Sequence, residues 1–424
     1  MEDELDPIPG LPESRAACRA LDLDDPLGGL RDQFALPEGT LYFDGNSLGP
    51  VTHGVVQAMR RVTEEQWGRD LISSWNTHGW IDWPERLGAK IAPLLGAAAD
   101  EVVVCDSVSV NLFKLLSAAL DLRPGRRAVL CQADHFPTDR YIAQGLVDRL
   151  GGDYRLVPFA VDALDAALDA AAGEAAAVCL SHVDFRSGRL EDMAELTALI
   201  HRAGALAVWD LSHSAGAVPV ALGECGVDMA VGCGYKFLNG GPGAPSFLAV
   251  ARRHHGELRT PIQGWLGHRQ PFDFSPKYAP AEGVLRFVAG TPPILAMAAL
   301  SAALDIFDDV KLEALRAKSV ALSELMIERV ERRCPGVFEL ISPRSAVDRG
   351  SQVTWRHPKG FAIVQALIAR GVVGDFRAPD LLRFGVTPLY QRYVDVWDAV
   401  EALGAVLDAD EHLDPRFERR GRVT

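Results

Sequence analysis

From about residue 100 onward, short apolar runs alternate with segments of helical periodicity, and this alternation constrains the fold more than any other feature of the chain. Strands joined through helices pair in parallel, and helices must then cover both faces of the sheet. The sequence therefore predicts an α/β domain with a mostly parallel central sheet. We expect buried strands at Glu101–Cys105, Arg127–Cys131, Ala175–Leu180, Leu206–Trp209 and Met229–Gly232, helices at Asn111–Leu120, Asp139–Leu150 and Asp192–Ala203, and an edge strand at Ser246–Ala251.

The character of the sequence changes after Pro292 and Pro293, where longer helical stretches alternate with isolated strands. This pattern is typical of a smaller α+β domain. The residues before a first strand at Leu41–Phe43 are acidic and rich in proline, as expected of an arm. We therefore divide the chain into an N-terminal segment at 1–55, a large domain at 56–295 and a small C-terminal domain at 296–424. Within the small domain we expect helices at Ile294–Phe307, Leu312–Arg333, Phe361–Arg370 and Tyr393–Leu407 and strands at Ser351–Trp355 and Leu381–Gly385.

The charge and the cysteines bear on partners and compartment. Asp and Glu number 57 against 43 Lys and Arg, which gives a net charge of −14. An acidic surface repels phosphate backbones, so we expect neither nucleic acid nor a membrane as a partner. Seven scattered cysteines without a C-x-x-C pair favour reduced thiols, and the acidic first residues have no apolar stretch of a signal peptide. These features predict a cytoplasmic protein.

Ligand sites in open α/β sheets lie beyond the carboxyl ends of the strands. The run ALAVWDLSHSAG places Asp210 at such an end, with His213 three residues later. Aspartate is also a favoured helix N-cap. A ligand contact and a helix cap therefore both remain open for Asp210 on this run alone.

The run VGCGYKFLNGGPGAPSF places Lys236 in a glycine-rich loop, directly after Tyr235. A lone loop lysine is ordinarily a solvated surface charge. In an apolar setting, however, its pKa falls and its amine can form a Schiff base with a carbonyl compound. A strand-end aspartate followed by a loop lysine suits pyridoxal phosphate, because the Asp210 carboxylate can pair with the ring nitrogen while Lys236 binds the aldehyde.

A third strand end carries the run CDSVSVNLFKLL, in which Ser107 and Ser109 precede a helix that opens near Asn111. Serine hydroxyls and free backbone N–H groups at a helix N-terminus can bind a phosphate. Serines at this place are also ordinary helix caps.

Two motifs point to other chemistry and are disfavoured. Ser47 stands in a G-x-S-x-G pattern, but a nucleophile elbow leads straight into a helix, and Pro50 interrupts that path. Gly232 and Gly234 lack the third glycine of a dinucleotide fingerprint, since Phe237 takes its place. We find no cluster at metal-ligand spacing and expect no metal.

At these residues the sequence resembles the kynureninases, within the aspartate-aminotransferase-like (fold type I) superfamily. The resemblance covers about Leu41 to Tyr390 and rests on seven blocks in order: LYFDGNSLGP, HFPTDRY, WDLSHSAG, GYKFLNGGPGAP, GWLGH, GTPPIL and RFGVTPLY. It implies a three-layer αβα large domain that binds pyridoxal phosphate, a smaller α+β domain and a homodimer with shared sites. It also implies hydrolysis of L-kynurenine, and less readily of its 3-hydroxy derivative, to anthranilate and L-alanine in tryptophan catabolism or NAD biosynthesis.

The resemblance further implies residue roles. Lys236 would hold the cofactor covalently and remove the substrate Cα proton, and Asp210 would keep the ring nitrogen protonated. Tyr235 would contact the phosphate region and is the nearest candidate proton shuttle. Arg383 would bind the substrate α-carboxylate, which suits a guanidinium. The further cofactor contacts would be Val108, Ser109, Phe136, Pro137, Thr138, Asp139, Ser181 and His213, with Trp265 and Thr291 reaching in from the neighbouring subunit.

Substrate choice depends on few positions in this comparison. Trp75 in the SWN block and Gly290–Thr291 resemble members that prefer kynurenine itself. In members that favour the 3-hydroxylated substrate, the position of Thr291 tends to be asparagine. A threonine does not offer the same amide hydrogen bonds to a ring hydroxyl.

Other activities of the same superfamily remain alternatives, namely an aminotransferase or a cysteine desulfurase. A desulfurase needs a mobile nucleophilic cysteine, and Cys334 stands at a helix end before Pro335. A non-enzymatic regulator would need an appended nucleic-acid-binding module, which neither end of this acidic chain resembles.

Overall fold

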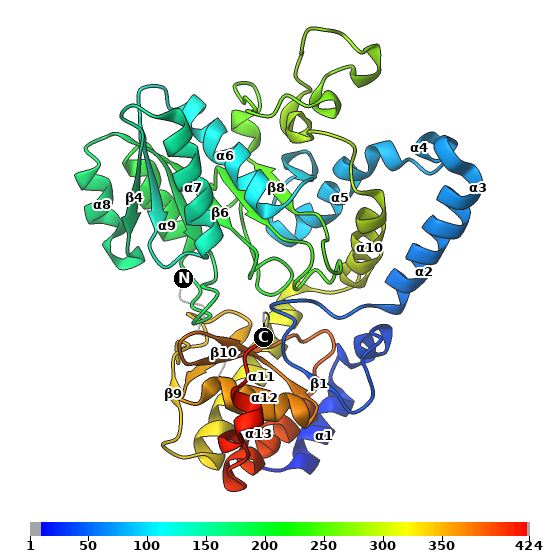
Figure 1. The fold of residues 1–424 in the computed structure, drawn as a ribbon, viewed down its shortest axis with the longest axis vertical. Coiled ribbons are helices and arrows are strands. Elements are labelled where there is room, and N and C mark those ends of the chain that lie inside the picture. The colour runs from blue at the N-terminus through cyan, green and yellow to red at the C-terminus, as the bar shows by residue number, and fades with distance from the viewer. Residues whose placement is uncertain (1–9, 422–424) are drawn as a thin grey trace. The chain divides into compact units, whose positions relative to one another are not determined.

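The computed structural model describes residues 10–421 and divides into two compact units (Figure 1). Compactness groups the N-terminal residues with the C-terminal part, whereas the sequence prediction set them apart as an arm at 1–55. It also places helix α10 in the larger unit, ten residues beyond the predicted boundary at 295. Unit 1 comprises Met1–His53, Arg186–Leu190 and Ile306–Thr424, and unit 2 comprises Gly54–Phe185 and Glu191–Asp305.

Unit 2 is built on a seven-stranded sheet with the order β2-β8-β7-β6-β5-β3-β4. The strands from β7 to β4 pair in parallel, while β8 runs antiparallel to both β7 and β2. The predicted α/β class with a mostly parallel sheet is thereby confirmed. The strands are β2 (Val102–Val104), β3 (Ala128–Gln132), β4 (Arg155–Phe159), β5 (Ala175–Ser181), β6 (Leu206–Asp210), β7 (Met229–Gly232) and β8 (Phe247–Val250).

In this sheet, two strands differ from the sequence prediction in their position or their presence. The strand predicted at Ser246–Ala251 is present as β8, but its expected position at the sheet edge is wrong, because β2 pairs along its outer side. The edge strand β4 was not predicted. It is partly exposed, and it carries Arg155 and Pro158 in place of a continuous apolar run.

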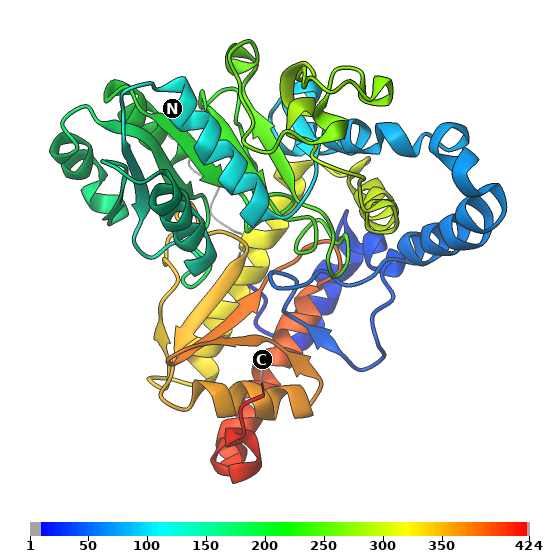
Figure 2. The ribbon, with the colours of Figure 1, turned by 45° about the horizontal axis from the view of Figure 1, so that its top comes forward.

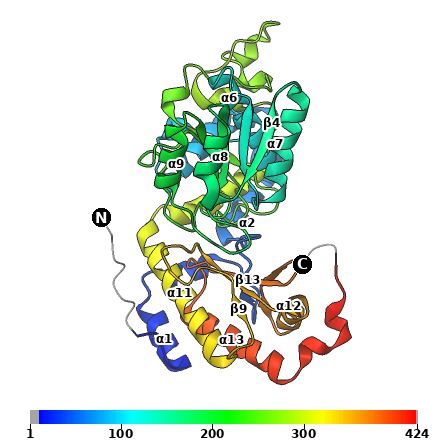
Figure 3. The ribbon, with the colours of Figure 1, turned by 90° about the vertical axis from the view of Figure 1, so that its left-hand side faces the viewer.

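Helices cover both faces of this sheet, as its apolar strands require. Helices α6 (Val108–Leu122) and α7 (Pro137–Leu150) bury one face in a shared apolar core. On the opposite face lie α8 (Leu164–Ala170) and α9 (Met193–Arg202), as Figure 3 shows. The sheet is therefore enclosed, and its strand ends are the natural opening for a ligand.

A chain of helices runs out from the sheet layer of unit 2 (Figure 2). Its base, α5 (Trp83–Ile91), packs tightly on β2, since a Cβ at Gly88 would lie 2.1 Å from the carbonyl oxygen of Val102. The outer part comprises α2 (His53–Arg61), α3 (Gly68–Asp70) and α4 (Ser74–Thr77), and α10 (Ile294–Leu304) lies beside its base. No helix among residues 10–421 has the length and apolarity to cross a membrane.

Unit 1 has a four-stranded antiparallel sheet of order β12-β13-β10-β9 and a separate parallel pair, β1 with β11. The predicted arm contains helix α1, which Ser14 caps and which packs on α13. Its Arg15 forms an ion pair of 2.6 Å with Asp398. The elements are α1 (Arg15–Asp24), β1 (Leu41–Tyr42), α11 (Leu312–Arg333), β9 (Glu339–Leu340), β10 (Gln352–Arg356), α12 (Gly360–Ala369), β11 (Val372–Val373), β12 (Asp375–Arg377), β13 (Leu381–Gly385) and α13 (Tyr393–Asp408).

Candidate active site

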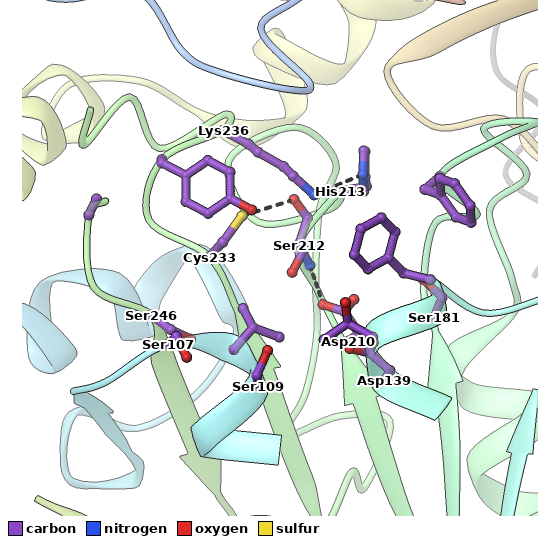
Figure 4. A pocket seen from close by; sticks show the side chains of 16 residues that line it. Ser107, Ser109, Asp139, Ser181, Asp210, Ser212, His213, Cys233, Lys236 and Ser246 are labelled. Atoms are coloured by element: carbon purple, nitrogen blue, oxygen red, sulfur yellow. Dashed lines mark hydrogen bonds between the residues drawn. The ribbon is translucent and has the colours of Figure 1, made fainter. Parts of the chain in front are cut away.

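A cavity of about 250 Å³ opens at the carboxyl ends of the central strands in unit 2 (Figure 4). Ser181 ends β5, Asp210 ends β6 and Cys233 follows β7, so the sheet itself brings these side chains together. Loops and the first turns of two helices complete the wall. The lining residues are Ser107, Val108, Ser109, Phe136, Thr138, Asp139, Ser181, Phe185, Asp210, Ser212, His213, Cys233, Tyr235, Lys236, Ala244 and Ser246.

Asp210 forms the floor of this cavity. Its side chain is 6% exposed, and its Oδ1 accepts a hydrogen bond of 2.8 Å from the Ser212 N–H. A turn, and not a helix, follows Asp210, so the helix-cap alternative is wrong. Burial, and then the charge of Asp139, raise the pKa of Asp210 to about 6. The protein therefore holds a carboxylate where its charge is costly unless a cation lies beside it.

Asp139 lies next to Asp210 at the start of α7, and Figure 4 shows their side chains together. Oδ2 of Asp139 is 2.9 Å from Nδ1 of His135, which is fully buried. Neither atom makes a hydrogen bond of good geometry within residues 10–421. Oδ2 of Asp139 thus faces the imidazole of His135, and Asp210 lines the cavity, where its carboxylate can accept a hydrogen bond from a ligand N–H.

Lys236 extends from the loop after β7 into the cavity, where its Nζ lies 2.9 Å from Nε2 of His213 (Figure 4). The loop turns tightly at Gly234, where a Cβ would lie 2.6 Å from the carbonyl oxygen of Pro245. The amine is therefore fixed at a partly enclosed site and not on the open surface. Beside it, burial raises the pKa of the Tyr235 hydroxyl, so the phenol keeps its proton at neutral pH.

At the other wall, helix α6 begins at the cavity. Ser107 caps it by accepting the Val110 N–H at 3.4 Å, and Val108 and Ser109 form its first turn. The first N–H groups of a helix have no acceptor within the helix, and the helix dipole favours an anion there. Asp106 precedes the cap with a φ of 47° and forms an ion pair with the buried Lys114. That pair holds the turn which presents the N–H groups.

These features fit pyridoxal phosphate. The helix N-terminus suits its phosphate, the Lys236 amine suits its aldehyde, and the buried carboxylate of Asp210, with Asp139 beside it, suits its ring nitrogen. Phe136 is 45% exposed at the cavity, edge-to-face with Phe185 at 5.2 Å between ring centroids, and offers an aromatic surface to a ring. The cavity therefore has the polar groups in the order that the cofactor requires.

The structure brings together most of the predicted contacts, namely Val108, Ser109, Phe136, Thr138, Asp139, Ser181, Asp210, His213, Tyr235 and Lys236. Pro137 starts helix α7 and does not line the cavity, and neither do the exposed Trp265 and Thr291. Sequence reasoning missed Phe185, Ser212, Cys233, Ala244 and Ser246. These five are small or apolar residues without distinctive chemistry, and only the strand order places them at the cavity.

Arg383 belongs to unit 1, in β13, and is 1% exposed. Its Nε donates to Asp375 at 3.0 Å, and one Nη donates to Ser47 at 2.9 Å. Ser47 also donates to Asp375 at 2.8 Å. It lies in a turn that does not lead into a helix, so it is no nucleophile elbow. Burial and the charge of Asp375 raise the pKa of Asp44 in the same cluster to about 7.

Comparison with known proteins places this geometry in context. The family model described as "Kynureninase C-terminal domain" matches residues 315–403. A protein named Kynureninase from Burkholderia mallei (strain SAVP1) is 48% identical over 419 residues, which is 97% of this chain and 100% of that protein. A Kynureninase from Pseudomonas fluorescens is 47% identical over 416 residues, with the same shares of both chains.

Solved structures share the fold at lower identity. A C-DES variant with glycine covalently linked to its PLP cofactor has a TM-score of 0.76 and 20% identity, over 88% of this chain and 98% of that one. A cysteine desulfurase from Thermococcus onnurineus NA1 has a TM-score of 0.75 and 19% identity, over 90% and 98%. At such identity the likeness concerns the fold alone.

Proposed function

The chain belongs to the kynureninase family, and we propose that it hydrolyses L-kynurenine to anthranilate and L-alanine, with pyridoxal phosphate held on Lys236. Such an enzyme is a hydrolase that acts on a carbon–carbon bond in a ketonic substrate. The observation that carries the proposal is the single cavity in which Lys236, Asp210 and the N-terminus of α6 converge. Incubation of the purified protein with L-kynurenine tests it. We expect anthranilate and alanine in equal amounts, and release of neither would overturn it.

Pyridoxal phosphate, when bound, supplies an electron-withdrawing ring that stabilises negative charge on the substrate carbons next to the bond that breaks. Lys236 would hold that group through its amine and would accept the substrate Cα proton at its Nζ. His213, 2.9 Å away, keeps the freed amine in place.

Asp210 would keep the ring nitrogen protonated. Its carboxylate is buried, and burial is the main cause of its raised pKa, so a protonated ring nitrogen beside it would relieve the cost of burial. Tyr235 retains its hydroxyl proton and can donate it at the cavity wall. We infer that Tyr235 hydrogen-bonds the phosphate or passes a proton to the substrate Cβ, which becomes the methyl group of alanine.

We infer that Arg383 binds the substrate α-carboxylate. Its guanidinium is held in one plane by Asp375 and Ser47, which suits a residue that must meet a planar carboxylate in fixed register. Lysine at this position would keep the positive charge but would lose the paired hydrogen bonds.

We also infer a homodimer that shares its sites. Trp265 and Phe272 pack edge-to-face at 5.7 Å, and Phe272 and Phe274 at 6.4 Å, although their exposed fractions are 41%, 61% and 77%. Between α3 and α4 of the same unit, Leu71 and Ile72 are 61% and 81% exposed. Apolar groups gathered at the surface in this way are typical of an interface.

For substrate choice, we infer that Thr291 favours L-kynurenine over its 3-hydroxy derivative. Thr291 is exposed in this single chain, as expected of a residue that completes a neighbour's site. A buried 3-hydroxyl without a good partner costs about 1–3 kcal/mol, which is roughly ten- to hundredfold in specificity.

The desulfurase alternative is not favoured. Cys334 caps the end of α11, is 4% exposed, and lies in the apolar core of unit 1. Burial raises the pKa of its thiol, whereas a nucleophilic cysteine needs a mobile, readily ionised thiol.

We further infer that the enzyme works in the cytoplasm, in tryptophan breakdown or in the synthesis of pyridine nucleotides. All seven cysteines are free, and six of them are buried, which suits a reducing compartment. Fractionation of cells, with the activity followed in each fraction, tests the location.

A further inference from the structure

A buried cluster of three charged side chains lies at the side of the cavity that Asp139 and Asp210 line. One ligand atom of each of His135, Asp139 and Asp210 lies within 4.8 Å of the other two. The side chain of His135 is fully buried, and that of Asp139 is 2% exposed. His135 does not line the cavity itself. It therefore acts on the site through the two carboxylates beside it, Asp139 and Asp210.

Burial by itself lowers the pKa of His135, but the ion pair with Asp139 outweighs burial and raises the pKa to about 9. The other groups that face its ring are Asp210 at the end of β6 and two thiols, Cys131 of β3 and Cys179 of β5, with Sγ of Cys179 3.8 Å from Nε2. Two effects raise the pKa of Cys179 well above its usual range, namely its hydrogen bond with Cys131 and its burial. That hydrogen bond lowers the pKa of Cys131. The carboxylates are thus the main partners of the ring.

The charges of the cluster can be counted. Two carboxylates and one imidazolium leave one negative charge, which a protonated ring nitrogen balances. Without the imidazolium, two adjacent buried carboxylates repel each other, and one of them takes up a proton. A protonated Asp210 would donate a hydrogen bond to the ring nitrogen and leave it uncharged, and the ring would then withdraw electrons less strongly.

We propose that His135 is a positioning residue that keeps Asp139 and Asp210 ionised together, so that the pair offers one net negative charge to the protonated ring nitrogen of the cofactor. The proposal rests on the proposed function in one respect, namely that this nitrogen faces Asp210. The charge of His135 itself can be measured without cofactor or substrate. Failure of this proposal is therefore distinguishable from failure of the proposed function.

The first test uses the full chain without cofactor and with ¹⁵N-labelled histidine. The His135 resonances are assigned by their loss in His135→Gln. In the native chain we expect a doubly protonated ring at about pH 7 that titrates near pH 9. In Asp139→Asn, which keeps the shape but removes the charge, we expect the ring to be neutral at about pH 7 because burial then dominates. A neutral His135 ring in the native chain at that pH would overturn the proposal.

The second test is the dissociation constant of pyridoxal phosphate as a function of pH, measured for the native chain and for His135→Gln. The charge of His135 lowers the pKa of Asp210, so its loss raises that pKa further. We therefore expect binding to weaken about tenfold or more near pH 7 and to converge with the native value near pH 9, where native His135 also loses its charge. The visible absorbance of the bound cofactor should report the same pH shift.

His182 provides a matched control. It is also buried, on the strand end after Ser181, but burial lowers its pKa to about 4, so it carries no charge near pH 7. His182→Gln should leave the pH dependence of binding unchanged. Equal weakening of binding at every pH in His135→Gln would mean that His135 serves packing alone and would overturn the proposal. If His135→Gln does not fold, the His135 resonance is assigned by eliminating the signals of the other histidines. Comparison of that resonance between the native chain and Asp139→Asn then still tests the proposal.

Discussion

Replacing Asp210 by Asn should stabilise the protein without cofactor and inactivate the enzyme. The pKa of Asp210 lies at about 6 in the folded chain against an ordinary value of 3.8, chiefly because the group is buried. A carboxyl whose pKa is raised by folding destabilises the folded state at high pH, where the group is ionised. Below about pH 4 both forms of the chain hold the proton, and the penalty of the buried charge grows as the pH rises from about 4 to about 6 and then stays constant.

At 1.36 kcal/mol per pKa unit, this difference in pKa corresponds to a cost of about 3 kcal/mol in folding free energy at pH 8. Because charged neighbours share the effect, we expect a cost of about 1–3 kcal/mol. Asn has no charge to bury, and its side-chain oxygen can still accept the Ser212 N–H at 2.8 Å. We therefore expect the free energy of unfolding of Asp210→Asn without cofactor to exceed that of the native protein by about 1–3 kcal/mol at pH 8. At pH 4 we expect the two free energies of unfolding to be about equal.

The same substitution removes the partner of a buried cation when the cofactor is bound. Breaking a buried ion pair costs about 3–5 kcal/mol, and each 1.36 kcal/mol is a factor of ten in rate. If that cost falls on the transition state, kcat falls by about 10²–10⁴. Urea unfolding and steady-state assays of anthranilate release measure the two effects on one preparation.

Asp228 is the matched control, a buried aspartate beside the start of β7, which accepts hydrogen bonds from Ala207 N–H at 2.8 Å and Arg253 at 2.6 Å. Although burial opposes ionisation, its partners, His254 and His201 foremost, hold the pKa of Asp228 well below the usual range. Asp228→Asn should therefore destabilise the fold by about 3 kcal/mol or more and leave kcat unchanged. Reduced stability of Asp210→Asn at pH 8, or near-normal turnover, would refute the reasoning.

Three further predictions concern the shared site and the substrate. Subunits with Lys236→Ala and subunits with Trp265→Ala, each inactive alone, should regain about a quarter of native activity when they are mixed. Half of the dimers then contain one subunit of each kind, and each such dimer has one intact site. Subunit exchange without recovery of activity would show that each site comes from one chain. Thr291→Asn should narrow the preference in kcat/KM for L-kynurenine over 3-hydroxy-L-kynurenine, and an unchanged ratio would remove Thr291 from substrate choice. Arg383→Lys should raise KM for L-kynurenine about tenfold or more, as expected when a charge-assisted hydrogen bond is lost, and an unchanged KM would assign Arg383 to structure alone.

Local sequence patterns predicted the parts of this molecule that local chemistry determines. The apolar runs gave β7 and β13 with their correct bounds, and the strand-end rule singled out Asp210 and, with the glycine-rich loop, Lys236. The position of β8 inside the sheet could not follow from its own residues, because it depends on β2, which precedes it by more than a hundred residues in the chain.

The charge cluster behind the cavity shows the same limit. His135 stands in a run that resembles known blocks, but a lone histidine in a sequence gives no sign of its charge. Its protonation depends on Asp139 one helical turn away and on Asp210, which a different strand brings near. Such a property comes from topology and burial together, and neither can be inferred from the run itself.

The most direct measurement is the position of the covalent bond between protein and cofactor. The holoenzyme is reduced with borohydride and digested, with and without prior addition of L-kynurenine. The masses of the peptides are then measured by mass spectrometry. We predict the mass of one reduced pyridoxal phosphate on the peptide that contains Lys236, loss of anthranilate formation in parallel, and protection of Lys236 by the substrate. Attachment at another lysine, or full cleavage of L-kynurenine after Lys236 has been modified, would contradict the account.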